Sequence, residues 1–107
     1  MKLNGKVVVI TGAGNGMGRE MTLEALRRGA SVFGVDLKAD ALAETAKLAG
    51  PGAKFASKAI DITNRTECAA LPAEVIKALG QVDVLVNNAG IIQPFVFVED
   101  LDFEHID

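Results

Sequence analysis

Short apolar runs alternate along this chain with longer segments in which apolar residues recur at helical spacing. A near-continuous apolar run, such as residues 7–10, is typical of a central parallel strand that is buried on both faces. In the next segment Met17, Met21 and Ala25 recur at every fourth residue, which predicts an amphipathic helix. The same patterns predict strands at residues 6–11, 31–36, 53–60 and 81–87, and helices at residues 16–28, 40–49 and 64–80.

The third predicted helix contains two notable features. Asn64, with Glu67 three residues further on, resembles a capping box that would open the helix. Pro72 lies inside the helix, where it removes one backbone hydrogen bond and clashes with the preceding turn. We therefore expect a kink, or a break into two shorter helices, at this proline.

Alternation of strands and helices predicts an α/β fold. Right-handed crossovers between parallel strands would form half of a doubly wound, Rossmann-type sheet with strand order 3-2-1-4. The length of 107 residues and the apolar content of 50% suit one small domain with one core. We expect no second domain.

A glycine-rich turn, Thr-Gly-Ala-Gly-Asn-Gly-Met-Gly at residues 11–18, links the first strand to the first helix. Gly12 suits the strained turn and the close approach of a pyrophosphate, while Gly18 would let the helix pack closely on the sheet. Asn15, Gly16 and Met17 would face the phosphates with the N–H groups of the first helical turn. By itself the segment is also compatible with an ordinary loop.

A carboxylate, Asp36, ends the second predicted strand. It would accept hydrogen bonds from the adenosine ribose hydroxyls of a dinucleotide and repel a 2′-phosphate. Asn15 and Leu37, from which a basic side chain would reach that phosphate, are both uncharged. The pattern therefore favours NAD over NADP, although Asp36 could also be a solvated strand end or a helix cap.

Composition restricts the classes of partner. The net charge is −3 and the 11 Lys and Arg residues are scattered, so we expect no nucleic-acid partner. Residues 1–6 lead into the first strand without the pattern of a secretory signal, and we expect no membrane span. Cys68 is the single cysteine and His105 the single histidine, so we expect no metal site. We expect Cys68 to be a free, buried or half-buried thiol in a cytoplasmic protein.

After the fourth strand, Asn87-Asn88-Ala89-Gly90 joins the earlier turn in a recognisable pair of motifs. Together they resemble the short-chain dehydrogenase/reductase family, whose signatures are TGxxxGxG and NNAG. The resemblance extends from the first strand to residue 107, and residues 61–63 resemble the family's short acidic motif. It implies that Asp61 accepts from the adenine amino group and Ile62 packs on the ring edge. It further implies that Asn88 stabilises the centre of the sheet while Ala89 and Gly90 line the ribose path. Read alone, residues 88–90 are also compatible with a simple turn.

The family's catalytic residues are not recognisable in this chain. The family transfers hydride between nicotinamide and an alcohol or carbonyl, using a tyrosine with a lysine four residues later, a serine and an asparagine. This chain contains no tyrosine, its last lysine is Lys77, and its serines, Ser31 and Ser57, belong to strand regions. We therefore assign no catalytic residue and expect residues 1–107 to be a truncated dinucleotide-binding domain, inactive alone.

Three functions stay open at this point. The chain is either the NAD-binding front half of a dehydrogenase, a complete non-catalytic nucleotide-binding or self-assembling module, or a nucleotide-binding transferase of the same fold. The NNAG motif argues against the transferase. The apolar segment at residues 91–98, beside an open edge of the fourth strand, would recruit another chain. We expect a homo-oligomer formed through this segment after Gly90.

Overall fold

A computed structural model of the protein describes residues 2–88. Its four strands are β1 (Val7–Thr11), β2 (Ser31–Asp36), β3 (Phe55–Ala59) and β4 (Val84–Asn87). The helices are α1 (Gly16–Arg27), α2 (Ala39–Ala49) and α3 (Arg65–Leu79). All strand pairs are parallel and the order is β3-β2-β1-β4, which confirms the predicted half of a doubly wound sheet. The observed third and fourth strands are shorter than the predicted ones.

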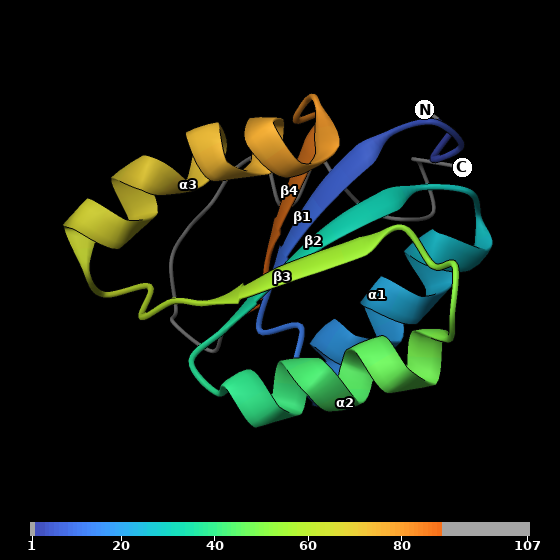
Figure 1. Ribbon diagram of the computed structural model, residues 1–107, viewed down its shortest axis with the longest axis horizontal. Coiled ribbons are helices and arrows are strands. Elements are labelled where there is room, and N and C mark those ends of the chain that lie inside the picture. The colour runs from blue at the N-terminus through green and yellow to red at the C-terminus, as the bar shows by residue number, and fades with distance from the viewer. Residues whose placement is uncertain (1, 89–107) are drawn as a thin grey trace.

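Helices cover both faces of the sheet, with α1 and α2 on one side and α3 on the other (Figure 1). The side chains of β1 therefore alternate between two cores. Val8 and Ile10 belong to the cluster that α1 and α2 cover, and Val7 and Val9 to the cluster under α3. This double burial explains why β1 is a continuous apolar run.

Of the two alternatives expected at Pro72, a kink or a break, the break into two shorter helices is wrong, because α3 runs through the proline as one helix of 15 residues. Leu71 and Val75 on either side of the proline pack into the same cluster, and Val75 is fully buried. Burial against the sheet offsets the lost backbone hydrogen bond, and Pro72 itself is exposed. Tertiary packing thus overrides the local preference.

The expected capping box at the start of α3 is half formed. Asn64 Oδ1 accepts from the backbone N–H of Glu67 at 3.1 Å, as predicted. The N–H of Asn64 instead donates to the carbonyl of Asp61 at 2.9 Å, closing a turn, so it is not available to Glu67. The Glu67 carboxylate accepts from the N–H of Asp61 at 3.1 Å. The start of α3 therefore also holds the preceding loop, because the Glu67 carboxylate bonds to Asp61.

Candidate functional site

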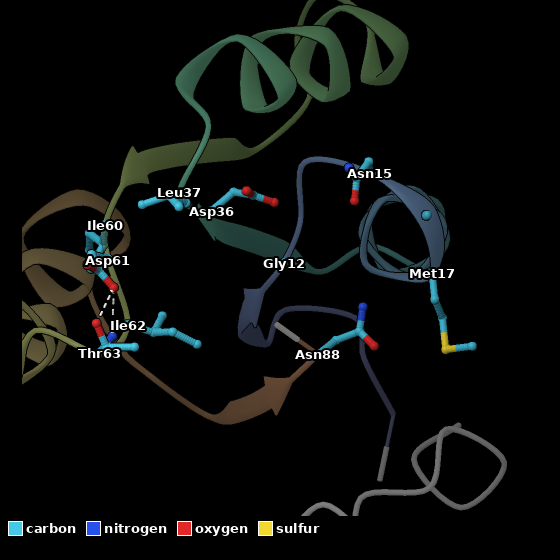
Figure 2. Close-up of a pocket in the computed structure, with 11 residues that line it drawn as sticks. Gly12, Asn15, Met17, Asp36, Leu37, Ile60, Asp61, Ile62, Thr63 and Asn88 are labelled. Atoms are coloured by element: carbon cyan, nitrogen blue, oxygen red, sulfur yellow. Dashed lines mark hydrogen bonds between the residues drawn. The ribbon is translucent and has the colours of Figure 1, made fainter. Parts of the chain in front are cut away.

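A cavity of about 470 Å³ opens at the carboxyl ends of the strands, where a doubly wound sheet binds its ligands. Its walls come from the turn after β1, the end of β2, the loop after β3 and the residue after β4 (Figure 2). Eleven residues line it: Gly12, Asn15, Gly16, Met17, Asp36, Leu37, Ile60, Asp61, Ile62, Thr63 and Asn88. Nine of the twelve residues that the sequence nominated are among them. Of the other three, Gly18 lies behind the turn, and Ala89 and Gly90 lie outside the described residues.

The turn between β1 and α1 depends on glycine at two positions for different reasons. Gly12 has a φ of +70°, in the left-handed region that favours glycine. Gly18 is buried, and a Cβ there would stand 1.9 Å from the carbonyl oxygen of Gly12. Only a residue without a side chain lets α1 approach the turn at the end of β1 so closely. The predicted close packing at Gly18 is confirmed.

The start of α1 faces the cavity. Asn15 is the N-cap residue in an extended conformation, and its side chain makes no capping hydrogen bond. Gly16 and Met17, the first two helical residues, line the same cavity, and Met17 is 69% exposed. Free N–H groups and the positive end of the helix dipole favour an anion at such a position.

Asp36 connects the end of β2 to the glycine turn. Its Oδ2 accepts the N–H of Gly14 at 2.9 Å, and its Oδ1 accepts the N–H of Lys38 at 3.1 Å. The cap alternative for Asp36 is wrong, because Lys38 is the N-cap residue of α2. Two backbone donors therefore hold a negative charge at the cavity wall, next to the exposed and uncharged Leu37.

Arg19 supports the same turn from behind, a role that the sequence analysis missed. Its Nη2 donates to the carbonyl of Gly14 and to that of Ala41, and its Nε donates to Thr45 Oγ1 at 2.9 Å. The buried Thr45 hydroxyl in turn donates to the carbonyl of Ala13 at 2.9 Å. The planar guanidinium thus ties the turn to α2. An arginine directly after the last glycine of the motif was the available sequence signal.

The loop after β3 contributes a second carboxylate. Asp61 Oδ1 accepts from the hydroxyl of Thr63 at 2.6 Å and from its backbone N–H at 2.9 Å (Figure 2). The Thr63 hydroxyl, and then its N–H, lower the pKa of Asp61 below its ordinary value. Asp61 is therefore ionised at neutral pH. Ile62 adds an apolar side chain to the same wall, which suits a ring that carries a hydrogen-bond donor on its edge.

The end of β4 is fastened to β1 at the centre of the sheet. Thr11 Oγ1 donates to Asn87 Oδ1 at 2.8 Å and accepts the N–H of Asn88 at 2.8 Å. These bonds place Asn88 between the strand ends, where its side chain lines the cavity. Thr11, the first residue of the glycine motif, therefore has a structural task that the sequence analysis did not assign.

Other nominated features have simple outcomes. Cys68 is a half-buried free cysteine, as predicted, and His105 lies outside the described residues. Across residues 2–88, no three His, Cys, Asp or Glu side chains form a group able to hold a metal ion. No helix in that part of the chain combines the length and hydrophobicity that crossing a membrane requires.

Comparison with known proteins agrees with the fold and the motifs. A sequence model of the short chain dehydrogenase family matches residues 6–107. "Short-chain dehydrogenase reductase 3b" of Arabidopsis thaliana is 35% identical over 106 residues, which are 99% of this chain and 41% of that protein. "7alpha-hydroxysteroid dehydrogenase" of Escherichia coli K12 is 44% identical over 94 residues, 84% of this chain and 36% of that protein.

A solved structure gives the same answer. The short chain dehydrogenase/reductase from Burkholderia phymatum in complex with NAD superimposes with a TM-score of 0.80 at 35% identity, covering 85% of this chain and 33% of that one. This chain belongs to the short chain dehydrogenase family of oxidoreductases and corresponds to its cofactor-binding half. It spans about two fifths of the length of the curated relatives that it matches.

Proposed function

We propose that the cavity binds NAD(H). The observation that carries this proposal is the direct bond between the two halves of the site, Asp36 Oδ2 to the N–H of Gly14. It puts a ribose-binding carboxylate next to a phosphate-binding turn. In the proposed complex the pyrophosphate lies at Asn15, Gly16 and Met17, with Gly12 and Gly18 shaping the turn, and Asp36 accepts from the ribose hydroxyls.

The adenine would occupy the other end of the cavity. Asp61 accepts from the exocyclic amino group, while Ile62 and Leu37 offer apolar contact to the ring. Asn88, Ala89 and Gly90 line the ribose path in this proposal. Support comes from the ionised state of Asp61 and from the presence of Asp61, Ile62, Leu37 and Asn88 in one cavity lining.

NAD is the preferred cofactor over NADP in this proposal. A 2′-phosphate would meet the Asp36 carboxylate, and like charges repel strongly in a partly enclosed site. Two backbone N–H groups already hold that carboxylate, so turning away would break both bonds. Leu37 provides no compensating positive charge at this wall.

The reaction is hydride transfer between nicotinamide and an alcohol or carbonyl, carried out by a longer protein of which these residues form the cofactor-binding part. When bound, NAD would accept the hydride and NADH would donate it. The residues of this chain hold and orient the dinucleotide, and we assign none of them to proton transfer because the chain has no tyrosine. The protein would work in the cytoplasm, in keeping with the free thiol of Cys68.

Self-association through residues 91–98 is a further part of the proposal. The segment Ile-Ile-Gln-Pro-Phe-Val-Phe-Val is strongly apolar and follows β4, whose Leu85 is already 36% exposed. Light scattering at rising concentration should show dimers or larger species. A strict monomer would contradict this part without affecting NAD binding.

Isothermal titration of the 107-residue chain with NAD, NADH and NADP tests the main proposal. We expect saturable binding of NAD and NADH, and NADP binding weaker by about tenfold or more, as one repulsive charge contact implies. A folded chain that binds no dinucleotide would contradict the proposal, and tighter binding of NADP would contradict the role of Asp36.

A further inference from the structure

Glu67 and Cys68, near the start of α3, form hydrogen bonds to the loop after β3 that lines the cavity. Glu67 Oε2 accepts the N–H of Asp61 at 3.1 Å, and Cys68 Sγ donates to the carbonyl of Ile62 at 3.2 Å. Asp61 and Ile62 line the cavity, whereas Glu67 and Cys68 do not. In the described part of the chain, α3 therefore reaches the cavity through the loop residues to which it is bonded.

The helix that carries Glu67 is held against the sheet by buried apolar side chains. Val75 is fully buried, and Leu71 and Leu79 pack against the same cluster under the sheet. Asn64 Oδ1 fixes the first turn of the helix by accepting the N–H of Glu67. The backbone of Glu67 is therefore held in place, and the hydrogen bond from the Asp61 N–H to its carboxylate holds Asp61 in place in turn.

The hydrogen bonds of Asp61 show how its carboxylate is oriented and how its loop is attached to the fold. Thr63 occupies Oδ1 with two hydrogen bonds, and within the described residues Oδ2 accepts none. The Thr63 bonds orient the carboxylate within the loop but do not attach the loop to the rest of the fold. Three contacts do this at or next to Asp61: the Glu67 bond to its N–H, the Asn64 N–H that donates to its carbonyl at 2.9 Å, and the N–H of Ile60 that donates to the carbonyl of Asp36 at 2.9 Å.

We propose that Glu67 is a positioning residue for adenine recognition: by holding the N–H of Asp61 it keeps the Asp61 carboxylate in reach of the exocyclic amino group. This role rests on the proposed NAD site. Glu67 touches no part of the cofactor. Its effect on binding is confined to the base end of the dinucleotide, because within residues 2–88 the hydrogen bond of its carboxylate to the cavity wall is made to Asp61.

A pair of dinucleotides that differ only at the base edge separates positioning from general stability. Nicotinamide hypoxanthine dinucleotide carries a carbonyl in place of the adenine amino group, so it lacks the exocyclic donor that Asp61 would accept from in this proposal. The wild-type chain should bind NAD about tenfold more tightly than this analogue, the order of one hydrogen bond to a charged group. Glu67→Ala should reduce that ratio to about twofold, mainly by weakening NAD binding.

Two further variants sharpen the test. Glu67→Gln keeps a neutral oxygen acceptor and should give a ratio between those of the wild type and Glu67→Ala. It also provides the measurement if Glu67→Ala does not fold. Glu44→Ala removes an exposed glutamate of α2 outside the cavity and should leave the ratio unchanged.

The possible failures are distinguishable. A folded wild-type chain that binds neither dinucleotide would contradict the proposed NAD site itself. A wild-type ratio near one would show that Asp61 does not read the amino group, and would overturn the role of Glu67. If Glu67→Ala and Glu67→Gln weaken both dinucleotides by the same factor and keep the wild-type ratio, Glu67 only stabilises the fold and the positioning role is wrong.

Discussion

The carboxylate of Asp36 accepts the backbone N–H of Gly14 at 2.9 Å, across 22 residues of sequence. This bond joins the two parts of the cavity that the proposed dinucleotide would bridge. Gly14 is held from its other side too, because Arg19 donates to its carbonyl. A Cβ on Gly14 would come within 2.7 Å of both Ala41 Cβ and Asp36 Oδ2, so a larger residue would displace the Asp36 carboxylate or α2. The turn and the carboxylate therefore form one preorganised unit.

Asp36→Asn should weaken NAD binding by about tenfold and bring the affinities for NAD and NADP close together. The variant retains an acceptor of the same size but removes the charge that strengthens the ribose bonds and repels a 2′-phosphate. Calorimetric titration with both cofactors measures the effect. Asp40→Asn, on an exposed aspartate outside the cavity, should leave both affinities unchanged. A variant that still rejects NADP would show that another residue sets the preference.

Gly18→Ala should destabilise the fold by about 3 kcal/mol, because the new methyl group would overlap the backbone carbonyl of Gly12. Urea denaturation followed by circular dichroism gives the free energy of unfolding. Gly80→Ala is the comparison: Gly80 has a φ of +90° but no atom near the added methyl, so about 1 kcal/mol is expected from backbone strain alone. Equal losses in the two variants would contradict the close-packing argument.

Thr63→Val should raise the pKa of Asp61 toward its ordinary value, because the hydroxyl bond is the largest cause that lowers it. A carboxyl with a lowered folded-state pKa stays ionised until the pH falls through that lower value. Wild-type preference for NAD over its hypoxanthine analogue should therefore persist to lower pH than that of the variant. Carbon-detected NMR titration of Asp61 gives the pKa directly.

Thr66→Val serves as the control for this titration, since Thr66 is an exposed threonine of α3 outside the cavity. It should leave the Asp61 titration and the pH profile of binding unchanged. If Thr63→Val titrates like the wild type, the Thr63 hydroxyl does not stabilise the ionised carboxyl.

Purified residues 1–107 should oxidise no alcohol and reduce no ketone with NAD or NADH. General acid/base chemistry needs a titratable group within reach of the reacting oxygen, and the chain has no tyrosine to fill the family's role. Absorbance at the NADH band over long incubations with varied alcohols and ketones would detect turnover. Hydride transfer that depends on this chain alone would contradict the prediction.

Local sequence patterns determined the elements, the strand order and most of the cavity lining. Apolar runs such as residues 7–10 marked buried strands, and crossover handedness restricted their order. The glycine turn and Asp36 were recognisable because the carboxyl ends of neighbouring parallel strands meet at one edge. These features depend on periodicity and on backbone rules, which a single sequence contains.

Only the tertiary structure decided how distant groups meet. Arg19 reaches Ala41 and Thr45 because α1 packs against α2. Glu67 reaches Asp61 because the turn closed by the Asn64 N–H and the Asp61 carbonyl brings Asp61 to the start of α3. α3 continues through Pro72 because the sheet buries the residues around it. Side-chain partners and the balance between burial and a lost hydrogen bond depend on three-dimensional packing, so sequence spacing alone could not predict them.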